Sequence, residues 1–361
     1  MSSEPPIKRP KITENEIDKF ITGIMTAEKN LQAILSDEYD KPIPFVKVFV
    51  GTARDPKELS KIIQVLNDKI PLKELSHLKR VRKKEVLLCQ SQHLNVLTQE
   101  TIQEYIEHNS PELKDSFQYF REIDVPLTPP KLRRQYLECN SKMWSVNFHP
   151  DKQLERLFSD SFFPEYDLKL HRTFMSLVFE TAYWYLSKHT KVELQDLFVG
   201  INIAVVVDPP RRSIVAIGLD NRQGHPLQHA AMLAIDNVAK TQNGGAWDAD
   251  GAKNILSGIN LDLMMHLKER YRQVMFGAKQ YLEKNEIREG SKSDSPYLCT
   301  GYDVYLLREP CLMCAMGLVH ARAKRVFFAV DNEFMGALKS KTKLQCVESL
   351  NHHFDVFTGF L

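Results

Sequence analysis

Alternating apolar and polar residues predict short strands in the first third of the chain, interleaved with segments of helical spacing. The expected strands are 43–51 (IPFVKVFVG), 78–90 (LKRVRKKEVLLCQ) and 121–127 (REIDVPL). Helical segments begin at 55–70, with Asp55 as N-cap and Pro56 at the first helical position, and in the same way at 110–120. This pattern predicts a small α+β domain.

The second half of the chain reads as helices and strands in alternation. Apolar residues recur every three or four positions in 168–189, 228–240 and 311–323, which predicts three helices. Continuous apolar or alternating runs predict strands at 201–209, 213–220, 297–309 and 324–330, with one more in the tail 350–361. A hairpin followed by alternating helices and strands is typical of a mixed sheet covered by helices on both faces, an α/β fold.

Proline and polar clusters place the domain boundaries. Residues 1–12 hold Pro5, Pro6 and Pro10 among polar residues, which indicates a disordered tail. We therefore expect an α+β domain at 13–125, a linker at 126–150 that contains two consecutive prolines, and the α/β domain at 151–361. Residues 241–296 are expected to be an insertion within the last domain.

Composition is that of an ordinary globular protein, with 43% hydrophobic and 26% charged residues among 361. No apolar run approaches the roughly 18 residues that span a bilayer, so we expect no membrane segment. The first residues lack the apolar segment of a signal peptide, so we expect an intracellular protein in which the six cysteines are reduced. The net charge is only +2, so nucleic-acid binding would depend on local basic patches.

Three residues of types that bind zinc stand at the expected starts of two helices. Cys311 and Cys314 follow Pro310, and His229 begins the helix at 228–240. Three protein ligands leave the fourth zinc position open, the arrangement of catalytic zinc. A C-x-x-C pair alone also fits a redox dithiol or two buried core cysteines, and a structural zinc finger would need a second ligand pair. The remaining cysteines are isolated and supply no such pair: Cys89, Cys139, Cys299 and Cys346. His352 and His353 are weaker candidates as ligands, and a surface or strand role is favoured for them.

The pattern nearly completes the zinc deaminase signature H-x-E followed by P-C-x-x-C, except that Ala231 stands where the glutamate belongs. That glutamate moves protons and is not a metal ligand. We expect Asp236 to face another side of its helix and Glu309 to face away from the metal, so neither replaces it. No catalytic residue is therefore expected in this chain.

The stretch REPCLMCAMGLVHARAKRVFFA (308–329) resembles the P-C-x-x-C helix and following strand of tRNA adenosine deaminases. The approach HPLQHA without glutamate, the insertion before PYLCTGYDVYLLREPC, the ending LNHHFDVF and the N-terminal domain narrow the resemblance. Together they are similar to the non-catalytic subunit 3 of the eukaryotic heterodimeric tRNA adenosine deaminases, within the cytidine/deoxycytidylate deaminase superfamily. In that family the position of Ala231 is non-acidic, commonly Val.

The resemblance implies a cytidine-deaminase-like three-layer domain with a five-stranded mixed sheet, preceded by the small α+β domain. It also implies a partner, the catalytic subunit 2, with which the chain would convert the wobble adenosine of tRNA anticodons to inosine. This chain would contribute assembly and tRNA binding, and Zn²⁺ held by His229, Cys311 and Cys314 would be structural. We expect the protein in nucleus and cytoplasm, and KRPK (8–11) is a candidate import signal or else a solvated tail.

Local basic clusters are candidates for tRNA contacts. The segment 79–84 (KRVRKK) holds five positive side chains, and as a strand it would carry charge on both faces, which phosphate contacts would explain. The five are Lys79, Arg80, Arg82, Lys83 and Lys84. The linker adds Lys131, Arg133 and Arg134, and Arg211 with Arg212 form a third candidate.

Two other functions fit the same residues. A self-sufficient zinc nucleoside or nucleotide deaminase would need an unusual base, and the missing glutamate argues against it. A zinc-stabilised interaction module without a link to tRNA is the other alternative, and the basic segment argues against that.

Overall fold

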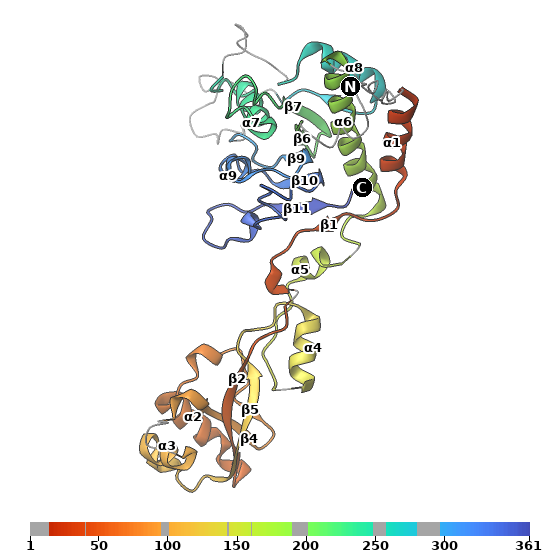
Figure 1. The fold of residues 1–361 in the computed structure, drawn as a ribbon. Helices are drawn as coiled ribbons and strands as arrows, with labels where there is room; N and C mark the ends of the chain where they lie inside the picture. The colour runs from red at the N-terminus through yellow and green to blue at the C-terminus, as the bar shows by residue number, and fades with distance from the viewer. Residues whose placement is uncertain are drawn as a thin grey trace, which may run out of the picture. The chain divides into compact units, whose positions relative to one another are not determined.

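The computed structural model describes residues 14–39, 41–94, 101–142, 144–159, 161–189, 201–247, 258–279 and 297–361. The chain divides into two compact units (Figure 1). The larger unit contains residues up to Ser36 and from Leu157 onward, and the smaller unit contains Asp37–Arg156. The expected tail at 1–12 lies outside the described residues.

The larger unit is built on a mixed sheet in the order β1-β11-β10-β9-β6-β7-β8. Its strands are β1 (Gln32–Ala33), β6 (Ile203–Asp208), β7 (Ser213–Leu219), β8 (Met275–Phe276), β9 (Asp303–Arg308), β10 (Arg325–Val330) and β11 (Asp355–Thr358). β9, β10 and β11 run parallel, whereas β6 pairs antiparallel with both β7 and β9. The sheet has seven strands where five were expected, because the two-residue strands β1 and β8 extend its edges.

Helices cover both faces of this sheet, as expected. α1 (Glu14–Thr26), α6 (Glu165–His189) and α8 (Leu261–Arg270) lie on one face, and α7 (Ala230–Lys240) and α9 (Leu312–His320) lie on the other (Figure 1). Successive strand residues point to opposite faces, so Val205 packs with α6 while its neighbour Val206 packs with α7 and α9. None of the described helices has the length and apolarity needed to cross a membrane.

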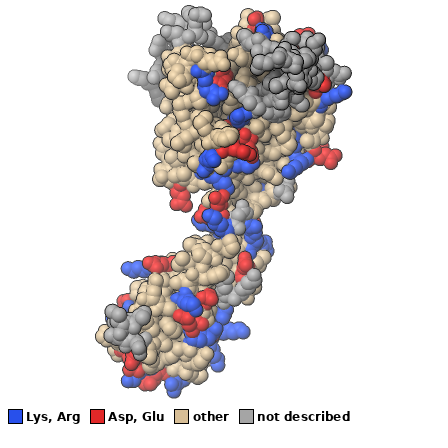
Figure 2. Space-filling view, in the orientation of Figure 1, with Lys and Arg blue, Asp and Glu red and all other residues tan. Residues whose placement is uncertain are grey.

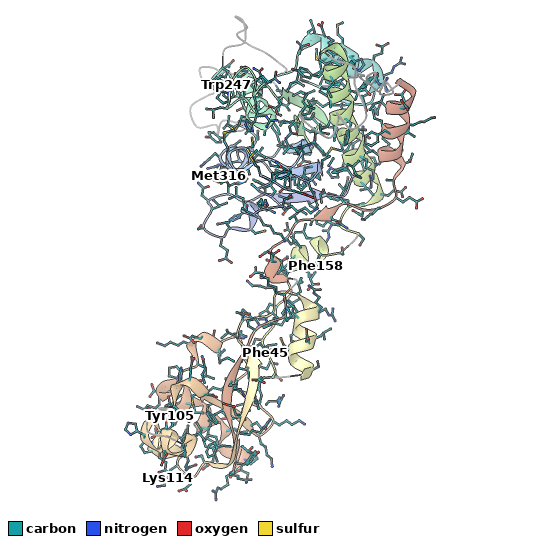
Figure 3. The ribbon with its side chains drawn as sticks, in the orientation of Figure 1. Phe45, Tyr105, Lys114, Phe158, Trp247 and Met316 are labelled. Carbon is teal, nitrogen blue, oxygen red and sulfur yellow. The ribbon has the colours of Figure 1, made fainter. Side chains whose placement is uncertain are left out.

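The smaller unit has a four-stranded sheet in the order β3-β4-β2-β5. Its strands are β2 (Phe45–Ala53), β3 (Val81–Arg82), β4 (Glu85–Gln90) and β5 (Phe117–Pro126), and its helices are α2 (Leu59–Lys69), α3 (Ile102–Asn109) and α4 (Arg133–Lys142). α5 (Lys152–Leu157) lies where the two units meet in sequence. Side chains fill the interior of each unit, whereas Phe45, at the start of β2, is 52% exposed (Figure 3).

The observed boundaries differ from the expected ones in two places. Residues 14–36 belong to the larger unit, where α1 packs against α6 and β1 pairs with β11. The expected linker at 126–150 is folded into the smaller unit, because α4 buries Cys139 there and Trp144 is fully buried beside it. Polar residues around the prolines concealed these two apolar anchors.

Two expected elements of the smaller unit are wrong. Residues 78–90 form a hairpin rather than one strand: Lys83 adopts a left-handed backbone with φ of 58° and turns β3 into β4. Residues 110–120 form only a short 3₁₀ turn at Pro111–Leu113 before β5 begins, since pairing of β5 with β2 overrides the helix-start signal of Ser110–Pro111. The cap at Asp55 is confirmed, because its side chain accepts a hydrogen bond from the amide of Lys57 at 2.9 Å.

Candidate metal centre and pocket

His229 is positioned by the close packing of α7 on the sheet. It is the N-cap residue of α7 and has an extended backbone, and its carbonyl accepts a hydrogen bond from the amide of Leu233. Gly218 in β7 allows this approach, because a Cβ at that position would lie 2.1 Å from the carbonyl oxygen of Ala230. The strand therefore sets where the helix, and with it the imidazole, begins.

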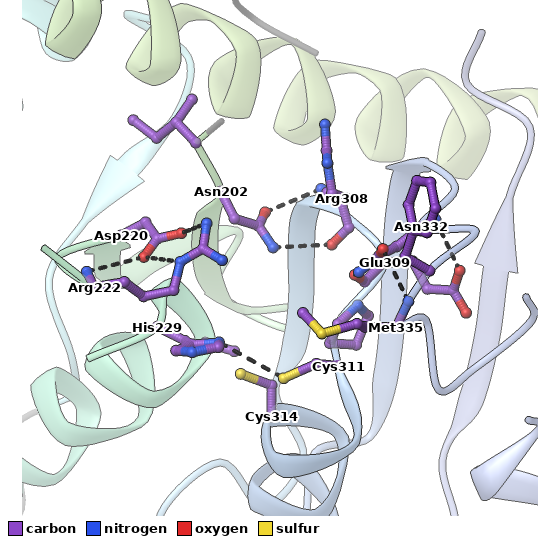
Figure 4. Close-up of a pocket in the computed structure, with 14 residues that line it drawn as sticks. Asn202, Asp220, Arg222, His229, Arg308, Glu309, Cys311, Cys314, Asn332 and Met335 are labelled. Atoms are coloured by element: carbon purple, nitrogen blue, oxygen red, sulfur yellow. Dashed lines mark hydrogen bonds and ion pairs between the residues drawn. The ribbon is translucent and has the colours of Figure 1, made fainter. Parts of the chain in front are cut away.

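The two cysteines lie at the start of α9 and face the histidine. Cys311 is the N-cap residue of α9 and Cys314 lies in its first turn. Their sulfur atoms and one ring nitrogen of His229 all lie within 4.8 Å of one another (Figure 4). Within the described part of the chain this is the one group of three or more His, Cys, Asp or Glu side chains able to hold a metal ion. The weaker candidates His352 and His353 instead contact the backbone carbonyls of Ala323 and Gln345.

The electrostatics of this cluster favour a thiolate. Cys314 hydrogen-bonds to the sulfur of Cys311 and lowers the pKa of Cys311 to about 5, and amides at the start of α9 and His229 add to the effect. The pKa of Cys314 is raised because it shares its proton with Cys311 and is buried. One anionic sulfur, a second thiol and an imidazole are a donor set that suits Zn²⁺.

The position of a proton-transferring group is filled by Ala231. This residue is 2% exposed and lines the pocket in front of the cluster. Asp236 faces elsewhere, as expected, because its carboxylate accepts from the amide of Ala246 and pairs with Lys240 at 2.8 Å. Glu309 borders the pocket, but its carboxylate is turned to a loop and is hydrogen-bonded there.

The pocket has a volume of about 320 Å³ and is formed at the ends of strands and helices. It is lined by side chains that the sequence pattern did not single out: Ile201, Asn202, Asp220, Arg222, Arg308, Asn332, Phe334 and Met335. The side chain of Asn202 accepts a hydrogen bond from the amide of Arg308 and donates one to its carbonyl (Figure 4). These bonds join the start of β6 to the end of β9. Of these residues, Arg308 could have been predicted from the sequence, because it directly precedes Glu309–Pro310–Cys311.

The basic segment 79–84 divides into exposed and structural residues. Lys79, Lys83 and Lys84 are exposed, and the last two form the turn between β3 and β4. Arg82 is half-buried, stacks over the ring of Trp144 at 4.4 Å and pairs with Glu85 at 3.3 Å.

Arg80 has a structural position that differs from the expected surface role. Its guanidinium donates to the side chain of Asn67 at 2.9 Å and to the carbonyl of Ile70 at 2.7 Å, where α2 ends. It also donates to the carbonyls of Leu87 and Leu88 in β4. Burial lowers the pKa of Arg80 to about 10. Four of its five N–H donors are used within the chain, which leaves one N–H of Nη1 for any further contact.

The other basic candidates are more open. Lys131, Arg133 and Arg134 are exposed, and Arg134 donates to the carbonyl of Tyr39. On the side shown in Figure 2, Lys and Arg lie among Asp and Glu in each unit, so the positive charge there is not continuous. In the larger unit, Arg212 is exposed and lies over the ring of Tyr166, and Arg211 is half-buried.

Comparison with known families accounts for both units. Residues 46–144 match the model of the tRNA-specific adenosine deaminase TAD3 N-terminal domain. Residues 171–330 match the cytidine and deoxycytidylate deaminase zinc-binding region, and this range includes His229, Cys311 and Cys314. The expected deaminase-like fold is therefore confirmed.

Relatives of known name match nearly the whole chain. A Danio rerio protein named probable inactive tRNA-specific adenosine deaminase-like protein 3 is 32% identical over 343 residues, 91% of this chain and 90% of its own. The Homo sapiens protein of the same name is 30% identical over 91% of this chain and 88% of its own. The Arabidopsis thaliana tRNA-specific adenosine deaminase TAD3 is 27% identical over 88% of this chain and 92% of its own. This chain belongs to the TAD3 family of tRNA-specific adenosine deaminase-like proteins.

Proposed function

We propose that this chain is the non-catalytic subunit of a heterodimeric deaminase that converts the wobble adenosine of tRNA to inosine. The observation that carries the proposal is Ala231, a buried methyl group at a fully formed deaminase pocket. A methyl group cannot transfer a proton, whereas hydrolytic deamination of adenine requires several proton transfers. The partner, the catalytic subunit 2, supplies the glutamate.

The described carboxylates at the pocket do not replace that glutamate. Asp220 is paired with Arg222, with oxygen–nitrogen distances of 2.9 and 2.8 Å. Both oxygens of Glu309 accept hydrogen bonds from the loop 332–340. A positioned general acid–base group contributes roughly 10²–10⁴ in rate, so the isolated chain is expected to fall short of a working deaminase by at least that factor.

The donor set supports Zn²⁺ held by His229, Cys311 and Cys314. When bound, zinc would supply a Lewis acid and a link between α7 and α9, and in this chain we assign it the structural part. The test is zinc content after purification. We expect about one zinc per chain, lost in the double variant Cys311→Ser, Cys314→Ser and kept in Cys346→Ser, whose cysteine lies outside the cluster. Unchanged zinc in the double variant would contradict the ligand set.

We assign tRNA capture to the surface cations of the smaller unit. These are Lys79, Lys83 and Lys84 of the hairpin with the half-buried Arg82 beside them, and Lys131 with Arg133 and Arg134 at the start of α4. The exposed turn supports this role, because phosphate contacts need donors that the fold does not use itself. Arg80 is the weakest of the five cations of this segment for phosphate contacts, because most of its donors are used within the chain.

A salt titration tests this assignment. Changing Lys83 and Lys84 to Glu should weaken tRNA binding and reduce the slope of log affinity against log salt by about 1–2, because fewer counterions are released. The matched control is Lys61→Glu with Lys57→Glu, two exposed lysines near the start of α2. A salt slope equal to that of the unchanged protein would refute the assignment.

The decisive experiment is inosine formation in tRNA with each combination of chains. We expect no inosine with this chain alone, activity when the catalytic subunit is added, and loss of activity when the glutamate of that subunit becomes alanine. Ala231→Val should leave the activity of the complex nearly unchanged. Inosine formed by this chain alone, after removal of trace partner, would favour a self-sufficient deaminase.

We also propose that the protein works in both nucleus and cytoplasm, with import through Lys8–Lys11 supported by the sequence KRPK. A fluorescent fusion with Lys8, Arg9 and Lys11 changed to Ala tests this. Nuclear signal equal to that of the unchanged fusion would contradict the assignment of the signal.

A further inference from the structure

The pocket in front of the metal ligands retains features that a purely structural zinc site does not need. We propose that it binds one unstacked nucleotide of single-stranded RNA, with the base against Phe334 and a phosphate at Arg308 and Arg222. The inference rests on the proposed function for the source of the RNA, which is the tRNA. It adds a contact site on the larger unit to those proposed on the smaller one.

Arg308 supplies the cation. It is half-buried at the end of β9, and no described residue forms a hydrogen bond or ion pair with its guanidinium. The neighbouring Glu309 cannot pair with it, because both of its oxygens are taken by loop amides and a hydroxyl. Arg222 lines the same pocket, and its positive charge adds to burial in lowering the pKa of Arg308. Asp220 pairs with Arg222 and Glu309 is bound to the loop, so no described carboxylate pairs with Arg308, and a phosphate would supply that partner.

Phe334 supplies the stacking surface. Its side chain is 88% exposed and that of the adjacent Met335 is 54% exposed, although both border the pocket. Burying such a side chain normally stabilises a protein by about 1.5–3 kcal/mol, so folding alone does not favour this exposure. Aromatic side chains that bind single-stranded RNA offer a base an open face of this kind.

The loop that carries Phe334 is bound to the start of α9, the helix that carries Cys311 and Cys314. Gly336 forms a bridge with Cys311, and the amide of Ala337 donates to the carbonyl of Pro310 at 2.9 Å. The amide of Met335 donates to the side chain of Asn332 at 3.2 Å. A fixed loop loses little conformational entropy when a base stacks on it, which favours binding.

The combination favours a nucleotide over a protein as the occupant. An exposed apolar pair alone would fit a protein surface. The guanidinium of Arg308, which has no partner among the described residues, would favour an anion in this pocket of about 320 Å³, a volume within the range of small-molecule sites. A nucleotide carries both an aromatic base for Phe334 and a phosphate for Arg308. A base alone or a phosphate alone would contact only one of these two side chains.

The test uses the full-length, zinc-replete chain and a fluorescent RNA hexamer that contains 4-thiouridine. To remove binding by the smaller unit, Lys79, Lys83 and Lys84 are changed to Glu in all samples. Phe334→Ala should weaken binding of the hexamer about 5- to 100-fold. Arg308→Gln should weaken it and reduce the salt slope by about 0.7, the value for one phosphate on a single strand.

Matched controls come from the same unit. Tyr297→Ala removes an aromatic side chain that is 60% exposed, and Arg272→Gln removes an exposed cation, both away from the pocket lining. Both should leave hexamer binding unchanged. Irradiation should cross-link the hexamer to the peptide that contains Phe334, identified by mass spectrometry.

Three results would overturn the inference. One is hexamer binding that Phe334→Ala and Arg308→Gln do not change, and the second is a cross-link that maps elsewhere. The third is a Phe334→Ala variant that binds RNA normally but no longer assembles with the catalytic subunit, which would identify a protein contact. Failure of the reconstituted complex to form inosine would refute the proposed function, whereas the hexamer assay judges the pocket independently.

Discussion

Glu309 anchors the loop 332–340, and replacing it with Gln gives a quantitative test of that role. One carboxylate oxygen accepts from the amides of Leu338, Lys339 and Ser340 at 2.9, 2.6 and 2.9 Å. The other accepts from the amide of Asn332 at 3.0 Å and from the hydroxyl of Ser340. The residue is 1% exposed, so water cannot replace these bonds.

The magnitude follows from what Gln can still do. Its carbonyl oxygen can keep the three amides, but its NH₂ group then faces the amide of Asn332, and two donors cannot pair. Losing one hydrogen bond to a charged acceptor costs about 1.5–3 kcal/mol, and the remaining bonds weaken because the acceptor becomes neutral. The lower cost of burying an amide offsets part of this. We expect a net loss of about 3 kcal/mol in the local stability of the loop, a factor of roughly 100 in its opening equilibrium.

Amide hydrogen exchange measures this opening directly. In Glu309→Gln, the amides of Leu338, Lys339 and Ser340 should exchange about 100-fold faster, since local opening exposes them to solvent. Glu333→Gln is the matched control, because it removes an exposed carboxylate from the same loop and should leave these rates unchanged. Exchange in Glu309→Gln within a factor of three of the unchanged protein would refute the anchoring role.

Three further predictions concern single groups. Arg80→Gln should lower the free energy of unfolding by at least about 1.5–3 kcal/mol, the value of one charge-assisted hydrogen bond, whereas Lys84→Gln should not, and urea titration distinguishes them. Burial lowers the pKa of His171 to about 3, so the unfolded chain binds one more proton than the folded chain between about pH 6.5 and 3. As the pH is lowered through that window, the free energy of unfolding should therefore decrease by up to about 1.4 kcal/mol per pH unit. His171→Gln should remove this contribution, whereas the exposed His149→Gln should not. With the pKa of Cys311 at about 5, its alkylation by iodoacetamide in the metal-free chain should be nearly independent of pH between 6 and 8 and be slowed by zinc. A roughly tenfold rise in rate per pH unit would contradict the thiolate.

Side-chain exposure and non-local contacts were the parts that sequence patterns did not predict. KRVRKK reads as a uniform basic strand, yet the hairpin turns Lys83 and Lys84 outward and Arg80 inward, because the carbonyl of Ile70 at the end of α2 needs a donor there. Similarly, residues 126–150 resemble a linker because single buried anchors such as Trp144 carry no periodic signal.

The sequence alone predicted the candidate metal ligands, which the structure brings together, and the missing acid. His229, Cys311 and Cys314 are set by helix starts, and Ala231 by its spacing from His229, so local pattern suffices for both. Only the tertiary structure placed Arg308 and Phe334 at the same pocket, because they come from a strand end and a separate loop. The carboxylate of Glu309 and the carbonyl of Pro310 hold that loop in place from a distant part of the sequence. Such packing depends on three-dimensional contacts that no periodicity encodes.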